Sequence, residues 1–391
     1  RLVFPGAGVR AGSLLTEGSM IAAVDPAADT VPDAAEPIDA DGALLTPGLI
    51  DVHTHGIRDA NYQEGPGELI RGTASLPRYG CTSVLPTIVP DPANPDFPED
   101  ISALCDAAKS VSDVAIPGLH LEGPFMAVTG AACPVVSGDI ALLADLIDAC
   151  AGMARVMSLS PDTPNSIPVI EWLCEHDIVP FITHTRATVD QTQAAIEAGA
   201  RHATHFYDVF YAPDEYDPGV RPVGAVEAIL ADPRVTVDFI CDGVHVHPVA
   251  VQMALAAKGY DKVMLVTDSN IGAGLPPGRY PTPWGYPVDV HPDRGARIAD
   301  RSQKGYGALA GSALTLNRAV ANIATWFEPP VDRLWAMATA NVAELILADS
   351  KGTLHPGADA DLVLWDDGFS PIRTWVGGKC VYDAADGSHE A

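Results

Sequence analysis

The sequence of 391 residues predicts an α/β fold: a (β/α)8 TIM-like barrel with a small β-sandwich domain formed by both chain termini. In the middle of the chain, eight short apolar segments alternate with helix-like stretches, as in barrels of parallel strands. Short strand-like segments separated by turns occupy both ends of the chain. We therefore expect a small β domain from residues 1–46 plus 352–391 and a barrel from residues 47–351.

The eight barrel strands are expected where apolar runs are bounded by turn residues or helix-like stretches. They lie near residues 48–53, 82–87, 115–122, 154–160, 178–183, 200–205, 235–240 and 262–267. A segment rich in Gly and Pro follows the eighth strand, and two long helices are expected at about 311–327 and 332–347.

The charge balance narrows the classes of partner. The chain has 51 acidic and 23 basic residues, a formal net charge of −28, and such a surface repels nucleic acid and anionic lipid. No apolar run of about 18 residues is present, so we expect no membrane-spanning segment. The first residues also lack the basic and then apolar order of a signal peptide. Seven scattered cysteines without a CxxC pair favour a reducing compartment. We expect a cytoplasmic protein with a small-molecule substrate.

The stretch PGLIDVHTHG at residues 47–56 is the first candidate for a functional site. If it is a strand, His53 and His55 point to the same side, because side-chain direction repeats every two residues. Two imidazoles on one face at a strand end can share a metal ion. The alternative is a pair of surface histidines, but the strand is apolar and Gly56 ends it at once.

Similar residues follow other predicted strands. Reading the strand ends in order gives Glu122, His184, His205, Asp242 with His245 nearby, and Asp268. Alone, Glu122 could cap a turn and His184 could be a core histidine. Because active sites of such barrels lie at the carboxyl ends of the strands, the set together predicts a site for zinc or another divalent ion.

These ligand types suggest hydrolysis. Neutral imidazoles and a carboxylate leave a divalent ion acidic enough to hold hydroxide near neutral pH. Asp268, at the end of the eighth strand in LVTDSN, is the candidate that moves the water's proton to the leaving nitrogen. The alternative is that Asp268 caps the next segment.

At this point the chain resembles the amidohydrolase superfamily and, within it, the N-acetylglucosamine-6-phosphate deacetylases. The resemblance rests on PGLIDVHTHG, HLEGPF (120–125), GARHATHF (199–206), DGVHVHP (242–248), LVTD (265–268), LAGSALTLNRAV (309–320) and GTLHPGADADLVLWD (352–366). It implies the barrel with its small β domain, metal ligands at Glu122, His184 and His205, His53 and His55 for a second metal, and Asp268 as general base and acid. It also suggests a homodimer.

The resemblance further aligns Arg221 and His245 with the family's phosphate-binding arginine and histidine. Two positions depart from the family pattern: Ala132 replaces a substrate-contacting histidine, and Asp208 lies where the family has asparagine. A carboxylate at Asp208 that faces the pocket would oppose a phosphate, unless it pairs with Arg221.

The leading hypothesis is metal-dependent hydrolysis of the amide of an N-acetylated amino sugar. The substrate would be N-acetylglucosamine 6-phosphate or a related N-acetyl compound, and the products acetate and the free amine. Alternatives are an N-acyl amino acid deacylase, a deaminase or a cyclic amidase acting on a non-phosphorylated substrate. A non-enzymatic alternative is an inactive scaffold or metal-binding protein, which would have no use for Asp268 as a proton shuttle.

Overall fold

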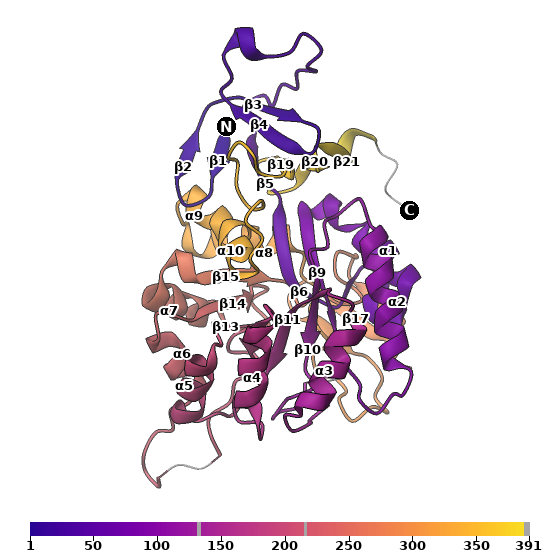
Figure 1. Cartoon of the computed structure of the whole chain (residues 1–391), viewed down its shortest axis with the longest axis vertical. Coiled ribbons are helices and arrows are strands. Elements are labelled where there is room, and N and C mark those ends of the chain that lie inside the picture. The colour runs from indigo at the N-terminus through magenta and orange to yellow at the C-terminus, as the bar shows by residue number, and fades with distance from the viewer. Residues whose placement is uncertain (131–133, 215–216, 387–391) are drawn as a thin grey trace.

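The computed structural model describes residues 1–130, 134–214 and 217–386. In Figure 1 the small β unit lies at one end of the molecule and contains the first and the last described strands, and the barrel forms the rest. The small unit contains a six-stranded sheet in the order β2-β1-β5-β19-β20-β21. The bounds are β1 (Leu2–Phe4), β2 (Gly8–Arg10), β5 (Leu44–Pro47), β19 (Leu362–Trp365), β20 (Pro371–Val376) and β21 (Lys379–Asp383). A separate hairpin of β3 (Leu14–Glu17) and β4 (Met20–Val24) packs beside it.

Eight parallel strands form the barrel in chain order, as the sequence predicts. Their bounds are β6 (Leu49–Thr54), β9 (Cys81–Ile88), β10 (Leu119–Glu122), β11 (Ala154–Leu159), β12 (Val179–Ile182), β13 (His202–Ala203), β14 (Thr236–Ile240) and β15 (Val263–Val266). Every residue of β6 and β9 is buried, which is why these strands read as continuous apolar runs. The third and sixth strands are shorter than the predicted segments.

The first and last barrel strands approach each other at a seam. The backbone N–H of Asp268 donates to the carbonyl of His53 at 2.8 Å, and Thr54 forms a parallel bridge with Ser269. Two carbonyls from a helical segment also reach the seam: Ile50 donates to Ala338 at 2.9 Å, and Leu265 donates to Met337 at 3.0 Å. These bonds complete the barrel near His53 and Asp268.

The helices surround the barrel (Figure 1). They are α1 (Pro66–Thr73), α2 (Phe97–Ser110), α3 (Ile140–Ala149), α4 (Ser166–Glu175), α5 (Val189–Ala198), α6 (Ala225–Ala231), α7 (Pro248–Lys258), α8 (Leu316–Phe327), α9 (Val331–Ala336) and α10 (Ala340–Leu345). Short 3-10 turns are η1 (Ala28–Thr30), η2 (Tyr62–Glu64), η3 (Leu76–Tyr79), η4 (Tyr260–Lys262) and η5 (Ala384–Asp386). Among the described helices, none combines the length and apolarity that crossing a membrane requires.

The prediction of one long helix at 332–347 was wrong, because this segment divides into α9 and α10. The break coincides with Met337 and Ala338, whose carbonyls accept the seam hydrogen bonds rather than helical ones. The preceding helix also begins later than predicted, at Leu316.

The Gly- and Pro-rich segment after the eighth strand forms a three-stranded antiparallel sheet. It consists of β16 (Gly278–Tyr280), β17 (Val288–His291) and β18 (Gly295–Ile298). The connection between β16 and β17 carries Trp284 and Tyr286. A small hairpin of β7 (Gly56–Ile57) and β8 (Ala60–Asn61) follows β6.

The small unit is joined to the barrel by buried aromatic contacts and by one short connection. Trp365 of β19 packs on Trp335 of α9 with ring centroids 4.8 Å apart, and its indole N–H donates to Thr46 at 2.8 Å. Only Gly48 separates β5 from β6, so the small unit leads directly into the strand that carries His53.

Candidate metal centre and active site

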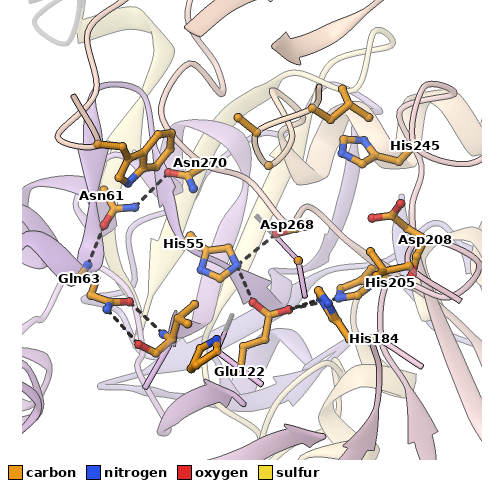
Figure 2. Close-up of a pocket in the computed structure, with 18 of the residues that line it drawn as sticks. His55, Asn61, Gln63, Glu122, His184, His205, Asp208, His245, Asp268 and Asn270 are labelled. Carbon is orange, nitrogen blue, oxygen red and sulfur yellow. Dashed lines mark hydrogen bonds and ion pairs between the residues drawn. The ribbon is translucent and has the colours of Figure 1, made fainter. Parts of the chain in front are cut away.

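Five of the side chains singled out from the strand ends line one pocket at the carboxyl end of the barrel (Figure 2): His55, Glu122, His184, His205 and Asp268. His53 belongs to β6 and Glu122 ends β10, whereas the others follow their strands by one or two residues. His184, His205 and Asp268 all have positive φ angles, of 46°, 34° and 47°. Such backbone conformations cost about 1–3 kcal/mol each in non-glycine residues and are concentrated at functional sites.

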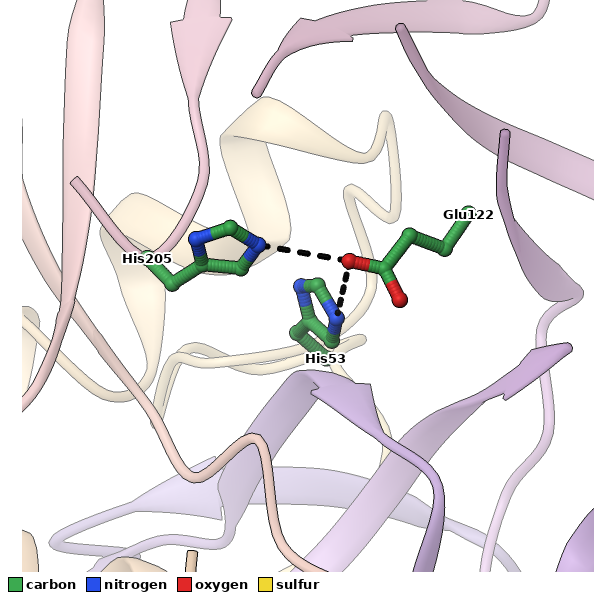
Figure 3. A group of neighbouring side chains, drawn as sticks. All are labelled: His53, Glu122 and His205. Carbon is green, nitrogen blue, oxygen red and sulfur yellow. Dashed lines mark hydrogen bonds and ion pairs between the residues drawn. The ribbon is translucent and has the colours of Figure 1, made fainter. Parts of the chain in front are cut away.

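Glu122 lies at the centre of the cluster. Its Oε1 atom is 3.2 Å from Nε2 of His184, 3.3 Å from Nε2 of His205 and 3.5 Å from Nε2 of His53. Its Oε2 atom is 3.2 Å from Nε2 of His55 (Figure 2), and Figure 3 shows the contacts of Oε1 with His53 and His205. Four imidazoles from three strands therefore face one buried carboxylate.

Two overlapping groups have the spacing of a metal site. The ligand atoms of His53, Glu122 and His205 all lie within 4.8 Å of one another, and so do those of His53, His55 and Asp268. Nε2 of His53 is buried and has no hydrogen-bond partner among the described residues. An orphaned nitrogen facing carboxylates is what a metal ligand requires, so the residues fit a bound cation.

The pKa values show how strongly the site attracts positive charge. Burial alone would lower the pKa of His55 and of His205. Hydrogen bonds to Asp268 and Glu122 raise the pKa of His55 to about 10, and the hydrogen bond to Glu122 with nearby negative charge raises that of His205 to about 10. Burial would raise the pKa of Glu122, yet the surrounding imidazoles hold it well below its usual range. Without a metal the cluster holds protons, and a divalent ion would replace them.

Asp268 stays ionised for similar reasons. Its Oδ1 atom is 3.3 Å from Nε2 of His55 and 3.9 Å from Nε2 of His53. Burial would raise its pKa, but the hydrogen bond from His55 and the nearby imidazoles lower it to about 2. The side chain is therefore a carboxylate that can accept a proton beside the metal-binding groups.

A set of buried polar residues behind the cluster was missed by the sequence reasoning. Asp238 of β14 accepts a hydrogen bond from the backbone N–H of His205, and its other oxygen is 2.8 Å from Nε2 of His202. Thr204 hydrogen-bonds with Nδ1 of His53 at 2.9 Å. A charged residue inside the apolar run VTVDFI was the available signal for Asp238. These contacts orient the imidazoles of the cluster.

His120, which precedes Glu122 by two residues, is not part of the cluster. Its Nδ1 donates to the carbonyl of Val52 at 2.8 Å, and its Nε2 accepts from Ser158 at 2.6 Å. Burial holds its pKa well below the usual range, so the ring is neutral and both nitrogens are satisfied.

Of the residues predicted to bind the substrate, some line the pocket and others do not. His245 and Asp208 line the pocket above the metal-binding cluster (Figure 2). Arg221 does not line it: its side chain is 88% exposed, and the guanidinium lies 3.9 Å from Glu227 on the surface. Ala132 lies outside the described residues. From the sequence, Arg221 could be recognised as a side chain suited to bind phosphate. The path of the loop that places it on the surface could not be predicted.

The pocket is a cavity of about 660 Å³ that opens over the cluster. Besides the residues named above, it is lined by amides of Asn61, Gln63 and Asn270 and by the rings of Trp284 and Tyr286. The side chain of Gln63 forms two hydrogen bonds with the backbone of Val89, which hold this wall in place. Such a cavity can enclose a ligand of the size of a sugar.

Comparisons with known proteins agree with this geometry. The model of the amidohydrolase family matches residues 44–381. The chain is 32% identical to N-acetylglucosamine-6-phosphate deacetylase from Vibrio furnissii, over 87% of this chain and 84% of that protein. It is 31% identical to N-acetylgalactosamine-6-phosphate deacetylase from Escherichia coli O157:H7, over 90% of this chain and 93% of that protein.

A solved structure shows the same architecture over nearly the whole chain. The crystal structure of N-acetylglucosamine-6-phosphate deacetylase from Pasteurella multocida is similar with a TM-score of 0.84 and 26% identity, and the match covers 97% of each chain. The chain therefore belongs to the amidohydrolase family and is a hydrolase.

Proposed function

We propose that the chain removes the acetyl group from an N-acetylated amino sugar, N-acetylglucosamine 6-phosphate or a related N-acetyl compound, and releases acetate and the free amine. The names of the relatives from Vibrio furnissii and Escherichia coli support this class of substrate. The observation that carries the proposal is the position of the Asp268 carboxylate beside His55, in one pocket with Glu122, His184 and His205.

We propose one or two divalent ions, with zinc as the metal, because imidazole and carboxylate ligands suit it. Glu122, His184 and His205 would hold the first ion, and His53 and His55 a second. When bound, the metal polarises the amide carbonyl and makes a water molecule acidic. The orphaned Nε2 of His53 supports its place in the second site.

Asp268 would carry the proton in this reaction. As a carboxylate it takes a proton from the attacking water, and it then gives this proton to the nitrogen that leaves. The contact with His55 keeps its oxygen turned toward the cluster. His205 is held from behind by Asp238, so the pocket keeps its shape while the proton moves.

We also propose a homodimer in the cytoplasm, with the small domain at residues 1–46 plus 352–391 and the barrel at 47–351. All cysteines in the described part of the chain are free, which fits a reducing compartment. Light scattering of the purified protein would test the dimer.

The central experiment measures acetate release from a panel of N-acetyl sugars together with the metal content of the same preparation. We expect release by the metal-loaded protein and loss of release after chelation. If a metal-loaded, folded preparation released no acetate from any N-acetyl sugar, the proposed function would be wrong.

A further inference from the structure

A second cavity of about 660 Å³ lies where the small unit meets the barrel. Its walls come from the β7–β8 hairpin, α1, η3, the segment around β16, and β21 of the small unit. In the described part of the chain, it shares no lining residue with the cavity over the metal-binding cluster, and the proposed reaction uses none of its residues. This cavity is therefore a separate candidate for a ligand.

Three arginines line the second cavity. Arg58 lies in the turn of the β7–β8 hairpin, Arg71 belongs to α1 and Arg78 belongs to η3. Among the described lining residues, Asp59 is the one carboxylate. The chain as a whole has 51 acidic and 23 basic residues, so this excess of positive charge opposes the general charge of the surface. Guanidinium groups suit the oxygens of a phosphate group, which they can bind in pairs.

Arg58 and Arg71 differ in what they already bind. Arg71 donates to carboxylate oxygens of Asp59 and Glu68 and to the backbone carbonyl of Asp59. Arg58 is half-buried, and in the described part of the chain its guanidinium forms no hydrogen bond and no ion pair; it interacts with Asp59 through charge alone. Because Asp59 is already held by Arg71, Arg58 has donors that lack an acceptor. A bound phosphate would supply one.

Hydrogen bonds hold the walls of the second cavity in place. Thr374 of β20 donates to the carbonyl of Pro77 in η3 at 2.8 Å, and this buried bond fixes η3 against the small unit. Arg71 fixes α1 against the β7–β8 hairpin, because its Nη1 atom lies 2.6 Å from Oδ1 of Asp59. Walls that are already ordered lower the entropy that binding costs, which favours a small ligand in this place.

The backbone of Arg58 links the second cavity to the metal-binding cluster. Arg58 has a φ angle of 57°, and its carbonyl accepts from the N–H of Gly272 at 2.6 Å. Three residues earlier, the N–H of His55 donates to the carbonyl of Ser269 at 2.8 Å. The hairpin is therefore joined at two points to the segment that follows Asp268. A ligand that restrains Arg58 would restrain both strand ends.

We propose that this cavity binds the phosphate group of a small molecule, with Arg58 as the main ligand and with Arg71 and Arg78 adding positive charge. Occupancy restrains His55 and the segment after Asp268. The site lies apart from the proposed reaction, so it does not depend on the identity of the substrate. Loss of a charged hydrogen bond of this kind weakens binding by about 10–100-fold.

Calorimetric titration of the metal-loaded protein at constant ionic strength tests the site. The probes are inorganic phosphate and glucose 6-phosphate, with glucose as the uncharged control. We expect both phosphates to bind and glucose not to bind. Tighter binding of the ester would identify a phosphorylated metabolite as the natural occupant, and equal or tighter binding of inorganic phosphate would identify the free anion. Absence of binding by both phosphates would overturn the proposal.

Matched variants assign the binding to this cavity. Arg58→Gln removes the charge and the paired donors, so the affinity of this site for phosphate should fall by about 10–100-fold. Arg234→Gln removes an equal charge from an exposed ion pair with Asp232 and should leave the titration unchanged. Melting temperature shows whether each variant is folded, and Arg71→Gln tests the same cavity if Arg58→Gln does not fold. Unchanged phosphate binding in a folded variant of Arg58 or, failing that, of Arg71 would overturn the proposal.

Hydrogen exchange measures the link to the metal-binding cluster. With phosphate bound, the amides of His55 and Gly272 should exchange at least about twofold more slowly in the wild-type protein and at an unchanged rate in Arg58→Gln. Binding without slower exchange at these amides would overturn the link. Neither measurement requires turnover, so these outcomes are independent of whether the protein releases acetate.

Discussion

The Oε1 atom of Glu122 lies 3.2 Å from Nε2 of His184, so a carboxylate from the third barrel strand meets an imidazole from the fifth. We expect Glu122→Gln and His184→Ala to lower the amount of metal bound per chain, because each removes a ligand of the first proposed ion. Metal analysis after dialysis measures this. His291→Ala, at an exposed histidine of β17, serves as the control. Full metal loading of the two site variants would show that the proposed ligand set is wrong.

Asp268→Asn should separate chemistry from metal binding. The amide cannot accept the proton from water, whereas Glu122, His184 and His205 remain in place. We expect turnover to fall by roughly 10²–10⁴-fold with unchanged metal content. Steady-state kinetics and metal analysis on one preparation measure both effects. Asp177→Asn, which removes the same charge from an exposed turn before β12, serves as the control. Near-normal turnover would exclude Asp268 as the proton carrier.

The number of bound ions, one or two, can be measured, and the prediction for two is specific. His53 and His55 share a face of β6, and their ligand atoms lie close to that of Asp268. We expect anomalous scattering from crystals of the zinc-loaded protein to show two peaks about 3.5–4 Å apart, one of them bonded to His53 and His55. A single peak out of bonding range of these two histidines would leave one ion only.

The metal-free protein should lose stability as the pH rises. His55 and His205 have pKa values raised to about 10 in the folded chain, above the ordinary value of 6.5 in the unfolded chain. Their protonation therefore stabilises the fold fully below about pH 6.5, and this contribution disappears as the pH rises through about 10. We expect Tm of the metal-free protein to fall from pH 7 to pH 10 more steeply than Tm of the metal-loaded protein. Parallel profiles would contradict the assignment.

The junction between the small unit and the barrel should tolerate little added volume. Gly80 has a φ angle of 76°, and a Cβ atom there would lie 2.2 Å from Cη2 of Trp365. Gly80→Ala should therefore lower the free energy of unfolding by about 1–3 kcal/mol, through both strain and overpacking. Urea denaturation measures this, and Gly152→Ala, at a glycine with φ of 81° and no neighbour in reach, isolates the backbone contribution. Equal losses in the two variants would show that the contact with Trp365 contributes nothing.

Local patterns in the sequence predicted most of the fold. The alternation of strands and helices predicted the barrel, and the strand ends predicted that His53, Glu122, His205 and Asp268 would meet, because parallel strands place their carboxyl ends on one side. The features that local patterns could not predict depend on contacts between segments that are distant in the sequence. The break between α9 and α10 arises from hydrogen bonds with β6 and β15, and the exposure of Arg221 arises from the path of a loop without regular structure.

The direct connection of β5 to β6 has a consequence for the order of folding during synthesis. β5 pairs with β19, in the register Leu45↔Leu364. The central part of the small sheet therefore cannot form until residues more than three hundred positions later have been synthesised. Pairings of such high sequence separation form slowly. One edge of β5 can pair with β1 early, but the edge that faces β19 remains unpaired until then, and we expect it to be a site where a ribosome-bound chaperone engages the nascent chain.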